Sequence, residues 1–189
     1  MLLEYPLTKA NRIRLARAFK HVPRVDLSIE CILEGQMGRA FVDDVQHPAA
    51  FKIEVGPFFY FAGDATSSGA YTMLENIVPY TLFMPSSPGW IRAAKEMYDK
   101  RLIGFNRYSF SSQQISYEHL DHFCQILAFR GKVRQMDLAF AVKLWEQDHF
   151  IDLSDFDSPE DFVQRGIGFY LENSGTVIGA AYSSLVCSK

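Results

Sequence analysis

Two glycines near the carboxyl end of the chain, Gly166 and Gly168 in the stretch QRGIG, have the spacing of a phosphate-binding loop. Such a loop holds a pyrophosphate through backbone N–H groups at the start of a helix, in the order strand, glycine turn, helix. Here a helical pattern precedes the glycines and a strand pattern follows them. The order favours Gly166 as the end of a helix and Gly168 as a strand residue where two backbones approach closely.

Histidine pairs and adjacent acids are the next groups that could do chemistry. His119 and His122 lie three apart in EHLDH, a spacing at which two imidazoles on a helix can share a metal. The sequence has no HExxH and no marked third ligand, so we favour an exposed polar helix face and predict no metal site. Asp43 and Asp44 follow a strand, where they could serve as a base or hold a cation, but a turn held by their side chains is favoured.

Motifs for nucleophilic catalysis are absent: the sequence holds no GxSxG, no HxxxD and no GK[ST] loop. Cys31, Cys124 and Cys187 lie far apart and form no CxxC pair, which indicates neither a zinc knuckle nor a disulfide scaffold. Small core residues are the favoured interpretation of all three. We therefore expect a protein of the reducing cytoplasm.

The composition and net charge limit the classes of partner that this protein is expected to bind. The 189 residues are 48% hydrophobic and 22% charged with a net charge of −3, which fits a soluble globular protein and gives no reason to expect nucleic acid. No run approaches the roughly 20 apolar residues of a membrane helix. The basic stretch TKANRIRLARAFKHVPR, residues 8–24, could be a transit peptide or bind an anionic surface, but a first helix with a solvated basic face is favoured. We predict neither a nucleic-acid nor a membrane partner.

The periodicity of apolar residues predicts a mixed chain of helices and strands, α/β (α+β) in class. The predicted helices cover residues 8–21, 24–35, 67–77, 87–101, 116–131 and 158–166. The predicted strands cover residues 38–44, 49–56 and 57–64 as an antiparallel meander, then 80–87 and 101–111, and a closing hairpin from residue 166 whose second strand runs from Thr176 to about Cys187. Polar residues gather near 130–137, so we expect an amino-terminal mixed α/β module of residues 1–133 and a second part of residues 134–189.

Three stretches carry a resemblance to a known family: ILEGQMGRAFVDDVQHPAAFKI, FYFAGD and DSPEDFVQRGIGFYLENSGTVIGAAYSS. The chain resembles the GNAT superfamily of N-acetyltransferases, and within it the GNAT acetyltransferases related to zwittermicin A resistance proteins. The resemblance implies an amino-terminal α/β module followed by an acyl-CoA N-acyltransferase fold, of which residues 134–189 supply a helix and the hairpin of the second and third strands. It also implies acetyl-CoA as the cofactor and transfer of the acetyl group to a primary amine, helped by proximity, a base and a backbone N–H for the oxyanion.

One departure from the family limits this expectation. The family's coenzyme loop, (Q/R)xxGx(G/A) at the start of a helix, has no counterpart here, because Val163 stands where Gln or Arg is required and lies before the hairpin. The resemblance therefore implies a truncated member that lacks the acetyl-CoA-binding part and is weakly active or inactive, with acetyl-CoA expected only for complete members. The alternative is a non-catalytic binding or self-assembly module.

The hairpin supplies the candidate site residues. Tyr170 and Glu172 alternate to one face of its first strand, and Tyr182 and Ser184 do so on its second, so one of these sets could contact a small-molecule amine acceptor. Ordinary strand packing explains them as well, and no catalytic or cofactor-binding residue is assigned. A closing apolar strand with an open edge predicts a homo-oligomer that associates through the C-terminal strand.

Overall fold

The structure, a computed structural model, describes residues 2–23, 27–75, 77–106, 108, 113, 115–126, 133–146 and 150–188. The chain divides into two compact units: the amino-terminal unit, Met1–Phe105 with Leu185–Lys189, and the hairpin unit, Asn106–Ser184. Both units contain helices and strands, which confirms the mixed α/β class. The sequence analysis placed the boundary after residue 133, and the compact units divide after residue 105. The two boundaries differ in the assignment of residues 106–133, whose helix at Tyr117–Ile126 has no buried residues, and the predicted boundary stays a prediction.

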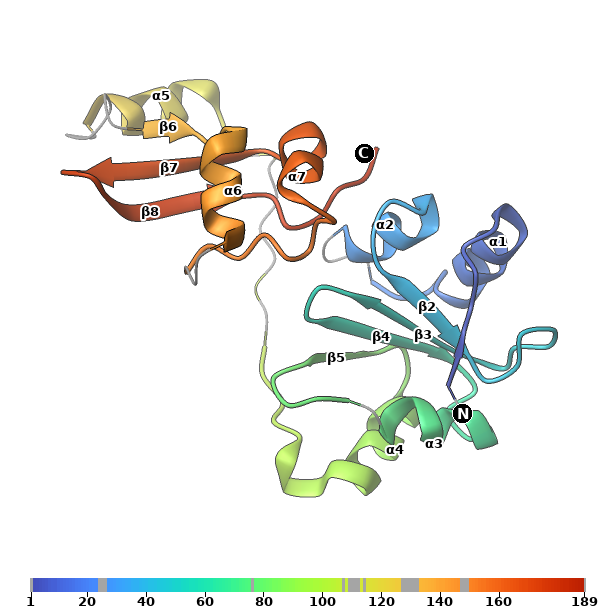
Figure 1. Cartoon of the computed structure of the whole chain (residues 1–189). Helices are drawn as coiled ribbons and strands as arrows, with labels where there is room; N and C mark the ends of the chain where they lie inside the picture. The colour runs from blue at the N-terminus through green and yellow to red at the C-terminus, as the bar shows by residue number, and fades with distance from the viewer. Residues whose placement is uncertain are drawn as a thin grey trace. The chain divides into compact units, whose positions relative to one another are not determined.

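The amino-terminal unit is built on a five-stranded sheet in the order β1-β2-β3-β4-β5 (Figure 1). Its strands are β1 Leu3–Glu4, β2 Arg39–Val42, β3 Ala50–Val55, β4 Phe58–Gly63 and β5 Leu82–Pro85. The first four pair antiparallel, which includes the predicted meander, and β5 lies parallel to β4. The strand β1 was not predicted, because two residues are too few to show the alternation of apolar and polar side chains that indicates a strand.

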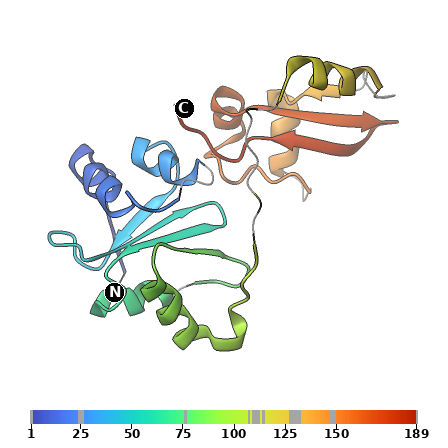
Figure 2. The same ribbon diagram turned by 180° about the vertical axis from the view of Figure 1, so that it is seen from behind.

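Helices cover both faces of this sheet. On one side lie α1 Lys9–Ala18 and α2 Ser28–Glu34, and on the other α3 Ser68–Glu75 and α4 Pro88–Tyr98 with a 3₁₀ turn, Asp99–Arg101 (Figures 1 and 2). Alternation along β3 explains the two layers, because Phe51 and Ile53 pack under α1 and α2 while Ala50 packs under α3 and α4. Both faces of the sheet are therefore buried.

Local signals set the ends of the first two helices. The Thr8 hydroxyl accepts the backbone N–H of Asn11 at 3.3 Å, as predicted for a helix cap, although α1 ends at Ala18 and not at residue 21. Gly35 ends α2 with a left-handed φ of 69°, a conformation that disfavours residues with a Cβ. The predicted strand at 101–111 is wrong over its described part, since 102–106 form no strand; residues 107 and 109–111 lie outside the described residues.

A charged side chain lies inside the layer beneath α3 and α4. Lys52 on β3 is 1% exposed, and its Nζ lies 2.6 Å from a carboxylate oxygen of Glu54. The same Nζ lies 4.3 Å from the ring centroid of Phe59, and 5.6 and 5.9 Å from those of Phe41 and Phe61. The ammonium group thus has one carboxylate and three aromatic faces as its surroundings.

The hairpin unit is smaller. Its elements are α5 Tyr117–Ile126, β6 Val133–Gln135, α6 Leu138–Glu146, α7 Pro159–Arg165, β7 Gly168–Asn173 and β8 Thr176–Tyr182. The three strands form an antiparallel sheet in the order β6-β7-β8. Ser174 and Gly175 join β7 to β8 with φ values of 52° and 82°, and such a two-residue turn with positive φ matches the twist of the hairpin.

Helix α7 begins as its sequence predicts. Ser158 caps it by accepting the Asp161 N–H at 3.2 Å, and Pro159 occupies the first turn. Arg165 lies 2.5 Å from the Asp161 carboxylate one turn away, and this hydrogen bond lowers the pKa of Asp161. These contacts fix the helix that leads directly into β7.

The last residues leave the hairpin sheet. The sequence predicts a final strand to about Cys187, but β8 ends at Tyr182, and Leu185–Lys189 belong to the amino-terminal unit. There the Ser188 N–H and hydroxyl donate to the two carboxylate oxygens of Glu34 at 2.6 and 2.8 Å. On the same helix, burial raises the pKa of the Cys31 thiol to about 11. No helix among the described residues is long and apolar enough to cross a membrane.

Candidate functional site on the hairpin face

The candidate site lies on the side of the β6-β7-β8 sheet against which α6 packs, here called the hairpin face. Cross-strand partners share a face, and Tyr170 is paired with Arg134 on β6 and with Ala180 on β8. Phe140 of α6 stacks on Tyr170, with ring centroids 3.9 Å apart and planes 9° apart, which identifies this side of the sheet. The register also places Tyr182, opposite Gly168, on the hairpin face.

Two of the predicted residues have clear structural partners. The Tyr170 ring is covered by Phe140 and is half-buried. Glu172, two residues further along β7, has a carboxylate oxygen 3.3 Å from Nε of Arg134, and both side chains are partly exposed. A partly exposed pair of this kind contributes little to stability, and its exposure leaves both charges accessible to a ligand.

Tyr182 connects the sheet to a preceding loop. Its hydroxyl oxygen accepts the backbone N–H of Asp152 at 3.2 Å. Ser184 lies beyond the end of β8, and its predicted alternation with Tyr182 along the strand is wrong because the strand has already ended. The structure thus brings Tyr170, Glu172 and Tyr182 to one face and leaves Ser184 outside the strand; a substrate role for the four residues stays a prediction.

Two acids of the loop before α7, Asp152 and Asp155, were missed by the sequence analysis, and the first of them contacts Tyr182 through its backbone N–H. Hydrogen bonds from the Ser154 N–H and hydroxyl lower the pKa of Asp152. Burial, with repulsion from Asp152, raises the pKa of Asp155. A half-buried carboxyl with a raised pKa is a better proton acceptor for an amine than an ordinary surface carboxylate. The signal in the sequence was FIDLSDFD, acids alternating with apolar residues directly before the α7 cap.

The glycines that resemble a phosphate loop serve packing. A Cβ at Gly166 would lie 2.8 and 2.9 Å from ring atoms of Phe162 and Phe156. A Cβ at Gly168 would lie 2.5 Å from Sδ of Met136 and 2.9 Å from Cζ of Phe162. Side chains therefore fill the space that a pyrophosphate would need, as the order of elements predicts.

The structure also describes the candidate metal ligands and the adjacent acids that the sequence offered. His119 and His122 are exposed on α5, with Cys124 beside them. Over the described ranges no three His, Cys, Asp or Glu side chains gather in a way that could hold a metal ion. Asp43 and Asp44 hold the turn after β2, as predicted: the Asp43 carboxylate accepts three backbone N–H groups and the Asp44 carboxylate accepts two.

Similarity to known proteins shows the family of this chain. The sequence model of the GNAT acetyltransferase family matches residues 18–189. No curated protein matches the chain. Among solved structures, the GCN5-related N-acetyltransferase-like protein from Streptococcus suis is similar, with a TM-score of 0.78 and 23% identity over 96% of this chain and 73% of that chain. This likeness shows the acyl-CoA N-acyltransferase fold, and the family match, which spans most of the sequence, shows that the chain belongs to the GNAT acetyltransferase family.

Proposed function

We propose that this protein takes part in the transfer of an acetyl group from acetyl-CoA to a primary amine of a small molecule. The observation that carries the proposal is the family match over residues 18–189. The hairpin face supports it, since it combines an aromatic surface with an ion pair, and the loop that contacts Tyr182 holds a carboxyl with a raised pKa. Acetyl-CoA supplies the acetyl group, and the residues described here act on the acceptor.

The acceptor amine must lose a proton before it can attack. In the proposed arrangement a carboxylate oxygen of Asp155 takes one proton from the acceptor ammonium group, which leaves a neutral amine and a neutral carboxyl. Burial of Asp155 favours its protonated form and so favours this transfer. The Tyr182 hydroxyl, fixed by the Asp152 N–H, and the Tyr170 ring would orient the acceptor.

Neither the two glycines of the QRGIG stretch nor the start of α7 fits the coenzyme's pyrophosphate. Gly166 and Gly168 are packed against aromatic and methionine side chains. The start of α7 is capped by Ser158, so its backbone donors are not directed at an anion. We therefore propose that residues 1–189 by themselves bind acetyl-CoA weakly and transfer the acetyl group slowly.

Calorimetry and thiol release test these two statements. Titration of residues 1–189 with acetyl-CoA should give no binding at micromolar concentration, and a micromolar Kd (about −8 kcal/mol) would contradict the weak-binding proposal. Release of free CoA thiol should be slow with a panel of primary amines and should fall at least about tenfold in Asp155→Asn. Asp157→Asn, an exposed acid of the same segment, is the control. Release at the spontaneous rate with every amine would contradict acetyl transfer.

A second candidate function is self-assembly through β8. Within the described part of the chain, β8 pairs only with β7, so its other edge presents backbone donors and acceptors. Ile178, the extra residue of a bulge opposite β7, is 49% exposed on this strand. We propose that two copies associate through β8. Sedimentation should then show a dimer for the wild-type chain and a monomer for Ile178→Lys, and a monomeric wild-type chain would refute the association.

A further inference from the structure

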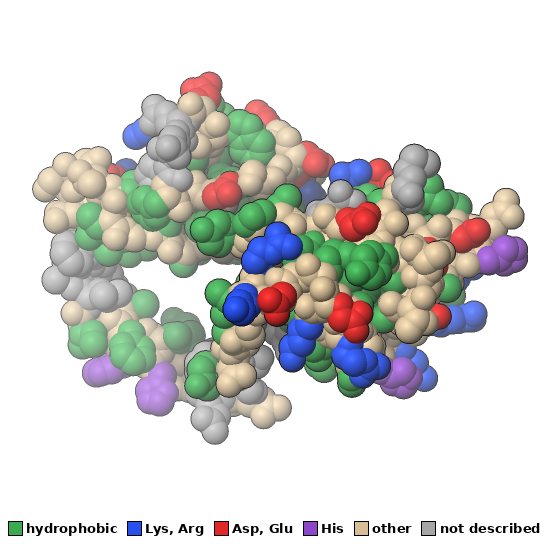
Figure 3. Space-filling view, turned by 90° about the horizontal axis from the view of Figure 1, so that it is seen from below, with side chains coloured by type: hydrophobic (Ala, Val, Ile, Leu, Met, Phe, Trp, Pro, Cys, Tyr) green, Lys and Arg blue, Asp and Glu red, His purple; other side chains and the backbone are tan. Residues whose placement is uncertain are grey.

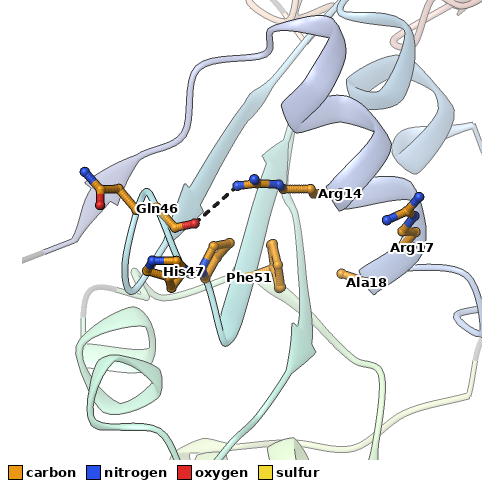
Figure 4. Close-up of a pocket in the computed structure, with 7 residues that line it drawn as sticks. Arg14, Arg17, Ala18, Gln46, His47 and Phe51 are labelled. Atoms are coloured by element: carbon orange, nitrogen blue, oxygen red, sulfur yellow. Dashed lines mark hydrogen bonds between the residues drawn. The ribbon is translucent and has the colours of Figure 1, made fainter.

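An open groove of about 600 Å³ lies on the amino-terminal unit, between α1 and the loop that joins β2 to β3 (Figure 4). Its lining residues are Arg14, Arg17, Ala18, Gln46, His47, Pro48 and Phe51. All of them belong to one compact unit, so the groove is formed by this unit alone. Three of its lining residues, Arg14, Arg17 and Ala18, belong to the basic stretch of residues 8–24. The proposed acetyl transfer assigns no role to these basic residues.

Two arginines form the helical wall of the groove. Arg14 and Arg17 are three residues apart on α1 and therefore lie on neighbouring turns of one side of the helix. Arg14 donates to the Gln46 carbonyl oxygen at 3.3 Å, which ties the helix to the loop (Figure 4). Among the interactions of the described residues, neither arginine pairs with a carboxylate, and α1 itself contains no acid.

The opposite wall is a loop that is held in shape by its own acids. The Asp43 carboxylate accepts the N–H groups of Ala49 and Ala50 at 2.9 and 3.0 Å. The Asp44 carboxylate accepts the N–H of His47 at 2.8 Å and that of Gln46, and these bonds lower its pKa. The negative charges of the loop are thus engaged with its backbone, while the His47 side chain lines the groove (Figure 4).

The floor of the groove is apolar. Phe51 is 8% exposed and belongs to the core beneath α1 and α2, and Ala18 and Pro48 flank it. A cationic rim over an apolar floor suits an anion that carries a compact hydrocarbon group, because guanidinium groups bind carboxylate and phosphate oxygens while the floor buries carbon.

A bilayer surface fits these observations less well. Leu15 and Phe19 are fully buried in the core, so Ile13, 49% exposed, is the large apolar side chain that α1 leaves at the surface. An interfacial helix needs a continuous exposed apolar face. On the face seen from below, Lys and Arg side chains are interspersed with Asp and Glu, so this face also lacks the single sign that an anionic bilayer would attract (Figure 3).

We propose that this groove is a binding site for a small organic anion, a carboxylate or phosphate on a compact aromatic or aliphatic group. The inference stands apart from acetyl transfer, since no residue of the hairpin face takes part in it. It gives the two arginines an anionic partner, which the described residues do not supply.

Titration of the ¹⁵N-labelled chain with phenyl phosphate, benzoate and inorganic phosphate tests the site. We expect saturable shifts of the Gln46, His47 and Phe51 amides with at least one of the two aromatic anions, and at least about threefold weaker binding of inorganic phosphate, which leaves the floor uncovered. Whichever aromatic anion binds more tightly identifies phosphate or carboxylate as the preferred head group.

Arginine variants distinguish a specific binding site from nonspecific electrostatic attraction of anions. Arg14→Gln with Arg17→Gln should weaken binding of the better aromatic anion at least about tenfold, because two charge-assisted contacts are lost. Arg92→Gln, an exposed arginine of α4 outside the groove, should leave binding unchanged. Either of two results would overturn the proposal: no saturable shift with any of the three anions below 10 mM (a limit of about −3 kcal/mol), or equal losses in the groove and control variants. Binding to phosphatidylglycerol vesicles without binding to the aromatic anions would also overturn it, in favour of a membrane surface.

Discussion

The two sheets of this protein differ in how much of their surface the described elements cover. In the amino-terminal unit helices cover both faces, and Trp90, Phe61 and Tyr60 are at most 1% exposed. In the hairpin unit α6 and α7 pack on one face, while the other presents Val133, 46% exposed, and Phe169, 42% exposed. The amino-terminal unit thus has a sheet that is covered on both faces, whereas the hairpin sheet is covered on the hairpin face, which carries the candidate site, and leaves its other face accessible.

The largest expected difference in stability is between substitutions of the two tryptophans, one in each unit. Trp90 is fully buried, and its Nε1–H donates to the Gly63 carbonyl at 3.2 Å, whereas Trp145 on α6 is 42% exposed. Trp90→Ala should lower the free energy of unfolding by about 3–5 kcal/mol, since it leaves a cavity. Trp145→Ala should cost about 1 kcal/mol or less. Urea denaturation followed by circular dichroism measures both, and similar losses would show that the two cores are equally closed.

Substitutions at the buried Lys52 and its partner Glu54 test how much an unpaired charge destabilises the amino-terminal unit. Glu54→Gln removes the carboxylate partner of Lys52 and should destabilise the fold by about 2 kcal/mol, less than for a fully buried pair because Glu54 is partly exposed. Lys52→Met removes the charge and keeps contacts with the surrounding rings, so its cost should be below about 1 kcal/mol. If Lys52→Met proved the more harmful change in urea denaturation, the lysine would have a role other than pairing.

Two glycines compare the covered and open faces of the hairpin sheet. Gly168→Ala would press a methyl group against Met136 and Phe162 and should cost about 1–2 kcal/mol. Gly179 lies opposite Leu171, one position away from the Tyr170 row and so on the other face, where a Cβ would meet nothing within 4 Å. Gly179→Ala should therefore change stability by less than about 0.5 kcal/mol. Melting temperatures of the two variants should differ clearly, and equal values would mean that the second face is also covered.

The smallest expected effect is a dependence on pH. Because the folded state raises the pKa of Asp155, the folded protein favours the protonated carboxyl, so this contribution is fully present below the unfolded pKa and is lost as the pH rises through the folded pKa. Asp155→Asn should thus stabilise the protein by a few tenths of a kcal/mol at pH 7 and have little effect at pH 3.5. Thermal unfolding at both pH values measures this, and a destabilised variant at pH 7 would assign Asp155 a structural hydrogen bond.

Local signals made much of the fold predictable, and long-range pairing limited the rest. Thr8, Gly35 and Ser158 act within a few residues of themselves, so the ends they set follow from the sequence. The strands β1 and β6 have two and three residues and exist through pairing with distant strands, which no periodicity records. The family's helix and hairpin were recognisable for the same local reason.

The candidate site was only partly predictable. The shared face of Tyr170, Glu172 and Tyr182 followed from alternation along the hairpin, whereas the predicted strand position of Ser184 was wrong because β8 ends at Tyr182. Asp152 acquires its place beside Tyr182, thirty residues later, only when the sheet forms. Asp155 owes its raised pKa to burial, which the tertiary structure creates.

The anchoring of Ser188 to Glu34 has a practical consequence for cutting the protein into parts. The polypeptide passes between the units twice, near residue 106 and again near residue 185. One protease cut at the first crossing would divide the chain into two fragments, which only noncovalent contacts such as those between Ser188 and Glu34 would then hold together. Release of the hairpin unit therefore takes this cut together with either a second cut near residue 185 or loss of the contacts of Ser188 with Glu34. A dye attached at position 188 would sense the surroundings of α2 although it follows the hairpin in the sequence.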